Sequence, residues 1–335
     1  MKKTVSIGLA LLTGLWFGLS DARAEEDVVI YSARKEHLLK PLLDAYRAKT
    51  GVTSRYLTDN EGPLLARLQA EGANTPADLL ITVDAGNLWH AAEQGVLSPV
   101  ESPLLLANIP EKYRDPGNRW FGLSVRARTL VYSTERVKAT DLSSYEDLAE
   151  AKWKGRLCLR SSEKIYNQSL VALMIARQGE AATEKIVRSW VGNLAVPVFS
   201  NDTKLMEAIA AGKCDVGIVN TYYYGALKKE KPDTPVALFW ANQNTNGTHV
   251  NISGAGVTKH AKHRDAAIKL LEWLATPEAQ GIFAELNLEF PANPQVKPHA
   301  TVSGWGAFKG EELNVSLAGQ HQADAVRLMD RAGYK

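Results

Sequence analysis

The amino-acid sequence predicts an α/β fold of two lobes. Short segments rich in Val, Ile and Leu alternate along the chain with amphipathic helical segments, a pattern typical of parallel-sheet α/β domains. With 335 residues, the chain is long enough for two lobes that each bury a hydrophobic core. It contains no internal repeat, low-complexity segment or long linker, so we expect lobes joined by crossing strands rather than separate domains in series.

The first elements are predicted from apolar runs and a helix stop signal. Residues 27–33 (DVVIYSA) and 77–83 (ADLLITV) are short apolar runs, which predict two buried strands. Between them, the periodicity of residues 36–49 predicts a helix that stops at Gly51.

Capping residues mark two later helices. Ser143 and Glu146 have the spacing of a capping box, and Thr276, which is followed by a proline, has the features of an N-cap. We also expect a strand at residues 214–220 and a helix at residues 266–275, where apolar residues recur with the helical period.

The first 24 residues have the features of a bacterial secretory signal. Two lysines follow the initiating methionine, residues 7–19 form an apolar run too short to span a bilayer comfortably, and an Ala-Arg-Ala cleavage site ends at Ala24. We therefore expect an exported protein whose mature chain begins at about Glu25.

The mature chain is expected to be formally neutral. Loss of three basic residues and one acidic residue with the signal leaves 36 of each sign from the 39 Lys and Arg and 37 Asp and Glu of the full sequence. This balance gives no indication of a nucleic-acid partner or of an anionic membrane surface.

The sequence has two cysteines, Cys158 and Cys214. In an oxidising compartment such a pair is more often a disulfide than a catalytic thiol, and we favour the disulfide. The bond would connect the segment before Tyr166 to the strand that leads into the tyrosine-rich stretch.

Three consecutive tyrosines, Tyr222 to Tyr224, follow the strand expected at residues 214–220. If Asn220 or Thr221 is the N-cap of a helix, the first two phenols lie about 100° apart on its first turn and can face one cleft. Tyr224 lies a further step round the helix and is expected to pack. The helix N-terminus should also favour phenolate below the usual pKa of about 10.

Phenolate is a hard, anionic oxygen donor, which suits Fe(III) better than zinc or copper. The competing interpretation is that the tyrosines are ordinary core aromatics at a strand–helix junction. The tyrosine run alone leaves both interpretations open.

The sequence resembles the ferric-iron-binding periplasmic proteins of ABC importers over nearly the whole mature chain. The most specific stretches are IYNQSL at residues 165–170 and NTYYYG at residues 220–225. The resemblance implies a type II-like periplasmic-binding-protein fold whose two α/β lobes close on one Fe(III) in the cleft between them. The three tyrosine ligands of that family correspond to Tyr166, Tyr222 and Tyr223 in this sequence. It further implies a periplasmic carrier, not an enzyme, that is monomeric and has an inner-membrane permease and its ATPase as partners.

The expected lobes are each built from two separate parts of the chain. The first lobe should contain residues 25–121 and 251–300, the second residues 127–247 and 301–335, and the crossing strands should lie near residues 122–128 and 248–257.

The rest of the coordination shell varies among these relatives. Some carry His or His-Tyr where this chain has Lys35-Glu36, and some use a Glu where it has Asp84. The sequence therefore resembles more closely the members that add a synergistic anion such as carbonate, which Arg34 and Arg126 would bind. Glu36 and Asp84 remain possible additional contacts.

Charge balance supports an anion, because three phenolates balance Fe(III) and two guanidiniums balance a carbonate. The alternative for both arginines is an ordinary ion pair at the surface or between the lobes.

Other readings are weaker. The same fold could bind a phosphonate, thiamine or a polyamine, and a secreted iron-dependent enzyme is a more distant possibility. The sequence has no nucleophile elbow, Gly-rich phosphate loop or HExxH motif. His260 and His263 are expected on a solvated cationic face, and His37 on a helix surface.

Overall fold

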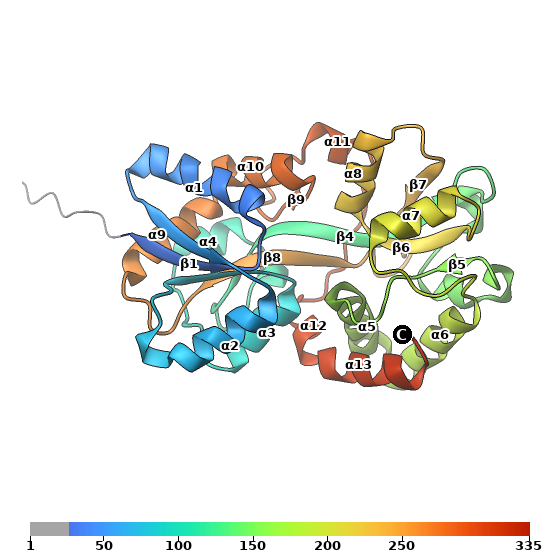
Figure 1. Ribbon diagram of the computed structural model, residues 1–335, viewed down its shortest axis with the longest axis horizontal. Coiled ribbons are helices and arrows are strands. Elements are labelled where there is room, and N and C mark those ends of the chain that lie inside the picture. Colours follow the sequence, from blue (N-terminus) through green and yellow to red (C-terminus); the bar gives the residue numbers. More distant parts are fainter. Residues whose placement is uncertain (1–26) are drawn as a thin grey trace, which may run out of the picture.

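The computed structural model describes residues 27–335, which form two α/β lobes side by side (Figure 1). The predicted signal segment lies outside these residues. The first lobe has a sheet in which β1 (Val28–Ser32) pairs in parallel with β2 (Ser54–Thr58) and β3 (Leu79–Val83). The predicted strands at residues 27–33 and 77–83 are therefore confirmed.

Two long strands connect the lobes. β4 (Phe121–Ser133) pairs with β8 (Val250–Val257) in the first lobe and then, from Arg128, with β6 (Val216–Asn220) in the second. Both run across the space between the lobes in Figure 1. All their pairings are antiparallel, so the sheet is mixed rather than parallel throughout.

Three short strands complete the sheet: β5 (Leu157–Cys158) runs parallel to β6, while β7 (Val236–Phe239) and β9 (Phe290–Pro291) pair with β4.

The helices cover the faces of the sheet. The main ones are α1 (Glu36–Thr50), α2 (Glu61–Glu71), α3 (Ala85–Glu93), α5 (Ile165–Gln178), α6 (Glu180–Gly192), α7 (Asp202–Ala210), α8 (Thr221–Glu230), α9 (Arg264–Leu274), α10 (Pro277–Asn287) and α13 (Gln322–Arg331). Three short helices are α4 (Pro103–Asn108), α11 (Ala300–Ser303) and α12 (Leu317–Gln320). Across residues 27–335, no helix is both long and apolar enough to cross a membrane.

Most of the predicted helix ends are confirmed. Gly51 adopts a left-handed conformation, with φ 82°, directly after α1, and Thr276 is the N-cap of α10. The helix predicted from Ser143 is wrong, because the segment forms only short 3₁₀ turns such as Glu146–Ala149. The side-chain amide of Asn193 donates to the carbonyls of Leu148 and Glu150, so those carbonyls are not left for a longer helix.

Separate hydrophobic cores support the two lobes. The first core packs helices such as α1 and α9 against β1, β3 and the crossing strands, and it includes Ile30, Leu79 and Leu271. In the second lobe, Trp153 and Trp190 belong to a cluster that also contains apolar side chains of α5 and α6. A further second-lobe cluster contains the predicted disulfide between Cys158 and Cys214, which is present in the structure.

The disulfide should contribute substantially to the stability of the second lobe. Cys158 and Cys214 are 56 residues apart, and closing a loop of that length stabilises by about 4 kcal/mol in the chain-entropy model. We expect reduction to lower the free energy of unfolding of the iron-free protein by about this amount. Urea unfolding with and without reductant measures it, with Cys158→Ala/Cys214→Ala as the control that reductant should not affect. Equal midpoints for oxidised and reduced wild type would contradict the prediction.

Candidate metal centre

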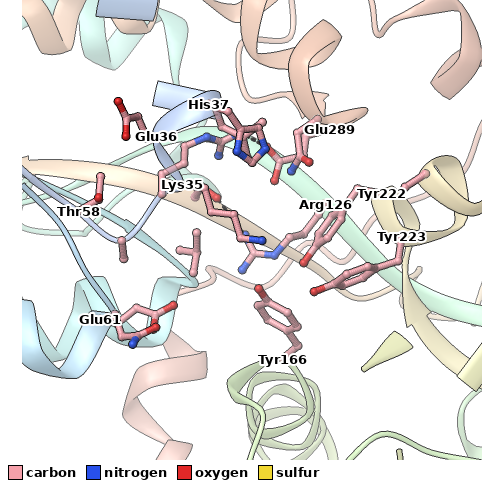
Figure 2. Close-up of a pocket in the computed structure, with 18 of the residues that line it drawn as sticks. Lys35, Glu36, His37, Thr58, Glu61, Arg126, Tyr166, Tyr222, Tyr223 and Glu289 are labelled. Carbon is pink, nitrogen blue, oxygen red and sulfur yellow. Dashed lines mark hydrogen bonds and ion pairs between the residues drawn. The ribbon is translucent and has the colours of Figure 1, made fainter. Parts of the chain in front are cut away.

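Tyr166, Tyr222 and Tyr223 converge on one cleft from the N-terminal turns of two helices. Tyr166 is the second residue of α5, and the other two lie in the first turn of α8. All three line a cleft with a volume of ≈ 620 Å³, and Figure 2 shows their hydroxyl groups pointing toward one another. The rings of Tyr222 and Tyr223 are 4.5 Å apart between centroids. The structure thus brings together the three residues that the sequence singled out.

Asn220 holds the first turn of α8 in place, although not by capping it with its side chain. It is the N-cap, but its Nδ2 donates to the Tyr222 hydroxyl at 3.1 Å and its Oδ1 accepts from Arg128 at 3.1 Å. Sequence reasoning found the cap position and missed this orienting bond.

The other end of the tyrosine turn is fixed by close packing. A Cβ added to Gly225 would lie 2.6 Å from Leu288 Cδ1 and 2.9 Å from Trp305 Cζ2, so only glycine allows α8 to approach so closely. Tyr224 makes an edge-on contact with Trp305, with ring centroids 5.9 Å apart, and does not line the cleft. Its predicted packing role agrees with this position.

Burial raises the pKa of Tyr166 and of Tyr222 rather than lowering it. Desolvation is the largest cause for Tyr166 and Tyr222, and the charge of Arg126 only partly opposes it. The pKa of Tyr222 lies well above its ordinary value, because burial removes water from its phenolate and, to a smaller extent, because ionised Tyr166 and Tyr223 would repel a second negative charge. The expectation that the helix N-terminus lowers these pKa values is therefore wrong: desolvation outweighs it. Before a metal binds, Tyr166 and Tyr222 therefore carry their protons at neutral pH.

Several cations surround the phenol rings. The Arg126 guanidinium lies 5.2 Å from the centroid of Tyr166, and the Lys164 ammonium lies 4.9 Å from it. Arg160 is 5.6 Å from the Tyr166 ring and 5.7 Å from that of Tyr223. Sequence reasoning missed Lys164 and Arg160, although both lie within the six residues before Tyr166 in the stretch LRSSEKIY.

Arg126 is buried in the crossing strand β4 but only loosely bonded. Its donors reach Asp84 at 3.4 Å and Ser253 at 3.5 Å, both long for hydrogen bonds. Figure 2 shows Arg126 and Lys35 extending toward the phenol oxygens. This arrangement leaves guanidinium donors able to bind an anion beside the tyrosines.

Arg34 also lines the cleft, but its guanidinium is already paired. Its Nη2 lies 2.7 Å from Oε2 of Glu289, with both side chains almost fully buried, and it stacks on the Phe283 ring at 5.0 Å. Of the two roles that the sequence left open, the structure shows the ion pair. Glu289 lies 255 residues from Arg34, and no motif in the sequence indicates the contact.

The two possible additional contacts are both engaged by other residues. Asp84 does not line the cleft: its carboxylate accepts bonds from Ser169 at 2.6 Å, Asn251 at 3.0 Å and the backbone of Gly86 at 3.0 Å. Glu36 lines the cleft but accepts from Tyr56 at 2.8 Å and points away from the tyrosines in Figure 2.

The histidines do not form a metal site. His37 lies on the exposed part of the cleft wall, and His260 lines a separate pocket of the first lobe. His263 differs from the expected solvated face, because its Nδ1 lies 3.1 Å from the buried carboxylate of Asp78. From residue 27 onward, no group of three or more His, Cys, Asp or Glu side chains could hold a metal ion.

Comparison with known proteins decides the family. The profile of the family described as bacterial extracellular solute-binding protein matches residues 42–310. The chain belongs to this family. This solute-binding protein is 41% identical over 345 residues to Iron uptake protein A2 of Synechocystis sp., an alignment that covers 100% of this chain and 98% of the relative.

Solved structures agree with the fold. A Trichodesmium protein (IdiA, FutA) in complex with iron and citrate ligands superposes with a TM-score of 0.89 at 44% identity, over 92% of this chain and 100% of that one. The Mannheimia haemolytica ferric iron-binding protein A, in an open conformation, gives a TM-score of 0.87 at 34% identity over 92% and 98%. The predicted two-lobe fold of this solute-binding protein is confirmed.

Proposed function

We propose that this protein captures Fe(III) between its two lobes in the periplasm and delivers it to an inner-membrane ABC permease with its ATPase. One observation carries the proposal: three phenol oxygens meet in one cleft. Phenolates are hard donors that match Fe(III), and three of them neutralise its charge. The names of the relatives, an iron uptake protein and ferric-iron-binding proteins, support the same ligand.

A synergistic anion, such as carbonate, is the second part of the proposal. Because Glu289 already neutralises Arg34, the two positive charges that balance a carbonate must come from elsewhere. Arg126, whose buried ion pair with Asp84 is long at 3.4 Å, supplies one, with a planar fork of donors suited to a planar oxyanion. Lys35 or Lys164 supplies the other: both line the cleft, and neither forms an ion pair with any residue between 27 and 335.

The alternative ligands and the alternative enzymatic role would each require a different arrangement of groups in the cleft. A phosphonate, thiamine or a polyamine would not need three phenol oxygens at one point. A secreted iron-dependent enzyme would keep one coordination position open to substrate and would turn over with oxygen, whereas a carrier saturates. The export signal expected at residues 1–24 agrees with a periplasmic carrier. We propose that this carrier acts as a monomer.

The decisive experiment is the colour and metal content of protein purified from the periplasm, followed by titration with Fe(III). One equivalent of iron and an orange-red phenolate-to-iron charge-transfer band are expected. Aminoethylphosphonate, thiamine and spermidine serve as comparison ligands. Binding of one of these without any coloured ferric complex would overturn the proposal, and steady oxygen consumption by the iron-loaded protein would favour an enzyme.

Iron affinity should depend on bicarbonate through Arg126. We expect Arg126→Lys, which keeps the charge and loses the fork, to weaken Fe(III) binding by roughly 10- to 100-fold, the usual cost of an altered outer-shell partner. Removal of bicarbonate should weaken the wild type similarly and affect the variant less.

The matched control is Arg119→Lys, because Arg119 pairs with Asp115 in the first lobe, away from the cleft. If the wild type showed no bicarbonate dependence and Arg126→Lys bound iron normally, protein side chains would have to fill the whole shell.

A further inference from the structure

Glu289 is a buried carboxylate in the cleft with only one oxygen engaged. Its side chain is 3% exposed, and its Oε2 accepts from Arg34 Nη2 at 2.7 Å and from Ser124 Oγ at 2.9 Å. Its other oxygen, Oε1, accepts no hydrogen bond from any residue in the range 27–335. Glu289 lines the same cleft as the three tyrosines, and Figure 2 shows it on the wall near Tyr222.

The backbone around Glu289 is fixed by contacts with both lobes. It follows Leu288, which ends α10 in a left-handed conformation with φ 51°, an uncommon state for a residue with a large side chain. The Leu288 side chain packs against Gly225 of α8, the helix that carries two of the tyrosines. Directly after Glu289, β9 pairs with Ser124 and Val125 of the crossing strand. The carboxylate therefore occupies a fixed place where the two lobes meet.

This arrangement is that of a metal ligand held by an orienting partner. A buried charge is costly unless it is fully paired, and here Oε1 of a carboxylate that lines the cleft accepts no hydrogen bond from residues 27–335. A carboxylate oxygen is a hard donor of the kind that Fe(III) prefers. Ligating carboxylates are in turn held by hydrogen bonds that fix their orientation, which is what Arg34 and Ser124 do.

We propose that Glu289 is a fourth protein ligand of Fe(III), contributing Oε1 when the lobes close, and that Arg34 is a positioning residue that acts through its Oε2. This inference rests on the proposed function. Three phenolates, Glu289 and a bidentate anion fill six positions without a water ligand. Fe(III), the phenolates, Glu289 and Arg34 also sum to zero charge, which leaves the anion to Arg126 and a lysine.

The first test compares Glu289→Gln with Glu36→Gln. Glu289→Gln keeps the shape and an acceptor for Arg34, while Glu36 is a carboxylate on the same cleft that points away from the tyrosines. We expect Glu289→Gln to weaken Fe(III) binding by at least about 100-fold and to shift the charge-transfer band, because changing a ligand costs more than the roughly 10- to 100-fold of altering an outer-shell partner. Glu36→Gln should bind within about twofold of the wild type, with an unshifted band, since an exposed charge is screened by solvent. Thermal melts of the iron-free variants separate loss of folding from loss of a ligand.

The second test is a double-mutant cycle with Arg34→Gln, Glu289→Gln and the double variant, which contains a neutral pair. If Arg34 acts through Glu289, adding Arg34→Gln to Glu289→Gln should change iron affinity by less than about twofold. Additive losses would instead show that Arg34 binds the anion directly and would overturn its assigned role. An unchanged affinity and band in Glu289→Gln would overturn the inference while iron binding by the wild type still stood. If the wild-type protein bound no Fe(III), that result would contradict the proposed function itself.

Discussion

Tyr222→Phe and Tyr223→Phe should each abolish tight Fe(III) binding and the charge-transfer band, and Tyr166→Phe should do the same. Phenylalanine keeps the ring and its packing, including the contact between the Tyr222 and Tyr223 rings, and removes only the donor oxygen. The loss should exceed the roughly 10- to 100-fold that follows from changing a group that merely orients a ligand. Competition titration with a chelator of known ferric affinity measures it.

Tyr224→Phe is the matched control for this series. Tyr224 belongs to the same helical turn but contacts Trp305 outside the cleft, so its substitution should leave both affinity and colour nearly unchanged. If Tyr222→Phe and Tyr223→Phe kept full iron affinity, the tyrosines would be core aromatics and the metal centre would lie elsewhere.

Iron loading should release protons, and acid should therefore release iron. Burial raises the pKa of Tyr166 and Tyr222, so the iron-free protein holds these protons at neutral pH. A ferric ion must displace them to form phenolates. For each displaced proton, affinity should fall by about tenfold per unit decrease in pH, which makes the dependence steep when several phenols are involved.

The measurement is calorimetry in buffers of different ionisation enthalpy, which counts the protons released per ion bound. A variant that lacks one phenol, Tyr223→Phe, should release fewer protons wherever its residual binding is measurable. Proton-neutral binding by the wild type would mean that the phenols are not deprotonated by the metal, and hence that they are not its ligands.

Local sequence signals were enough for much of the site. The stretch VGIVNTYYYG predicts a strand followed by the start of a helix. Apolar residues that favour β-strands are followed there by a capping residue, and the two-residue period of a strand ends. That junction already placed Tyr222 and Tyr223 on one helical turn. The family motif IYNQSL then supplied Tyr166, and the export signal made the Cys158–Cys214 disulfide the favoured pairing.

Other features of the site depend on contacts between distant segments. The resemblance to ferric-iron-binding proteins assigned Arg34 to an anion. Its partner Glu289 lies directly after α10, 255 residues later in the chain. No local sequence pattern indicates that these two side chains pair. Asp84 likewise lies at the predicted strand end, yet bonds from Ser169 and Asn251 in other elements turn its carboxylate away from the cleft.

The sequence by itself determined the fold class, the helix turn that presents the tyrosines and the chemistry of their oxygens, because each depends on residues within a few positions of one another. Only the tertiary structure decided which charges are free to meet a ligand. Burial set the direction of the tyrosine pKa shifts, and long-range pairing committed Arg34 to Glu289 while leaving Arg126 loosely bonded. Desolvation and ion pairing act between segments that folding brings together, so neither can be deduced from local sequence.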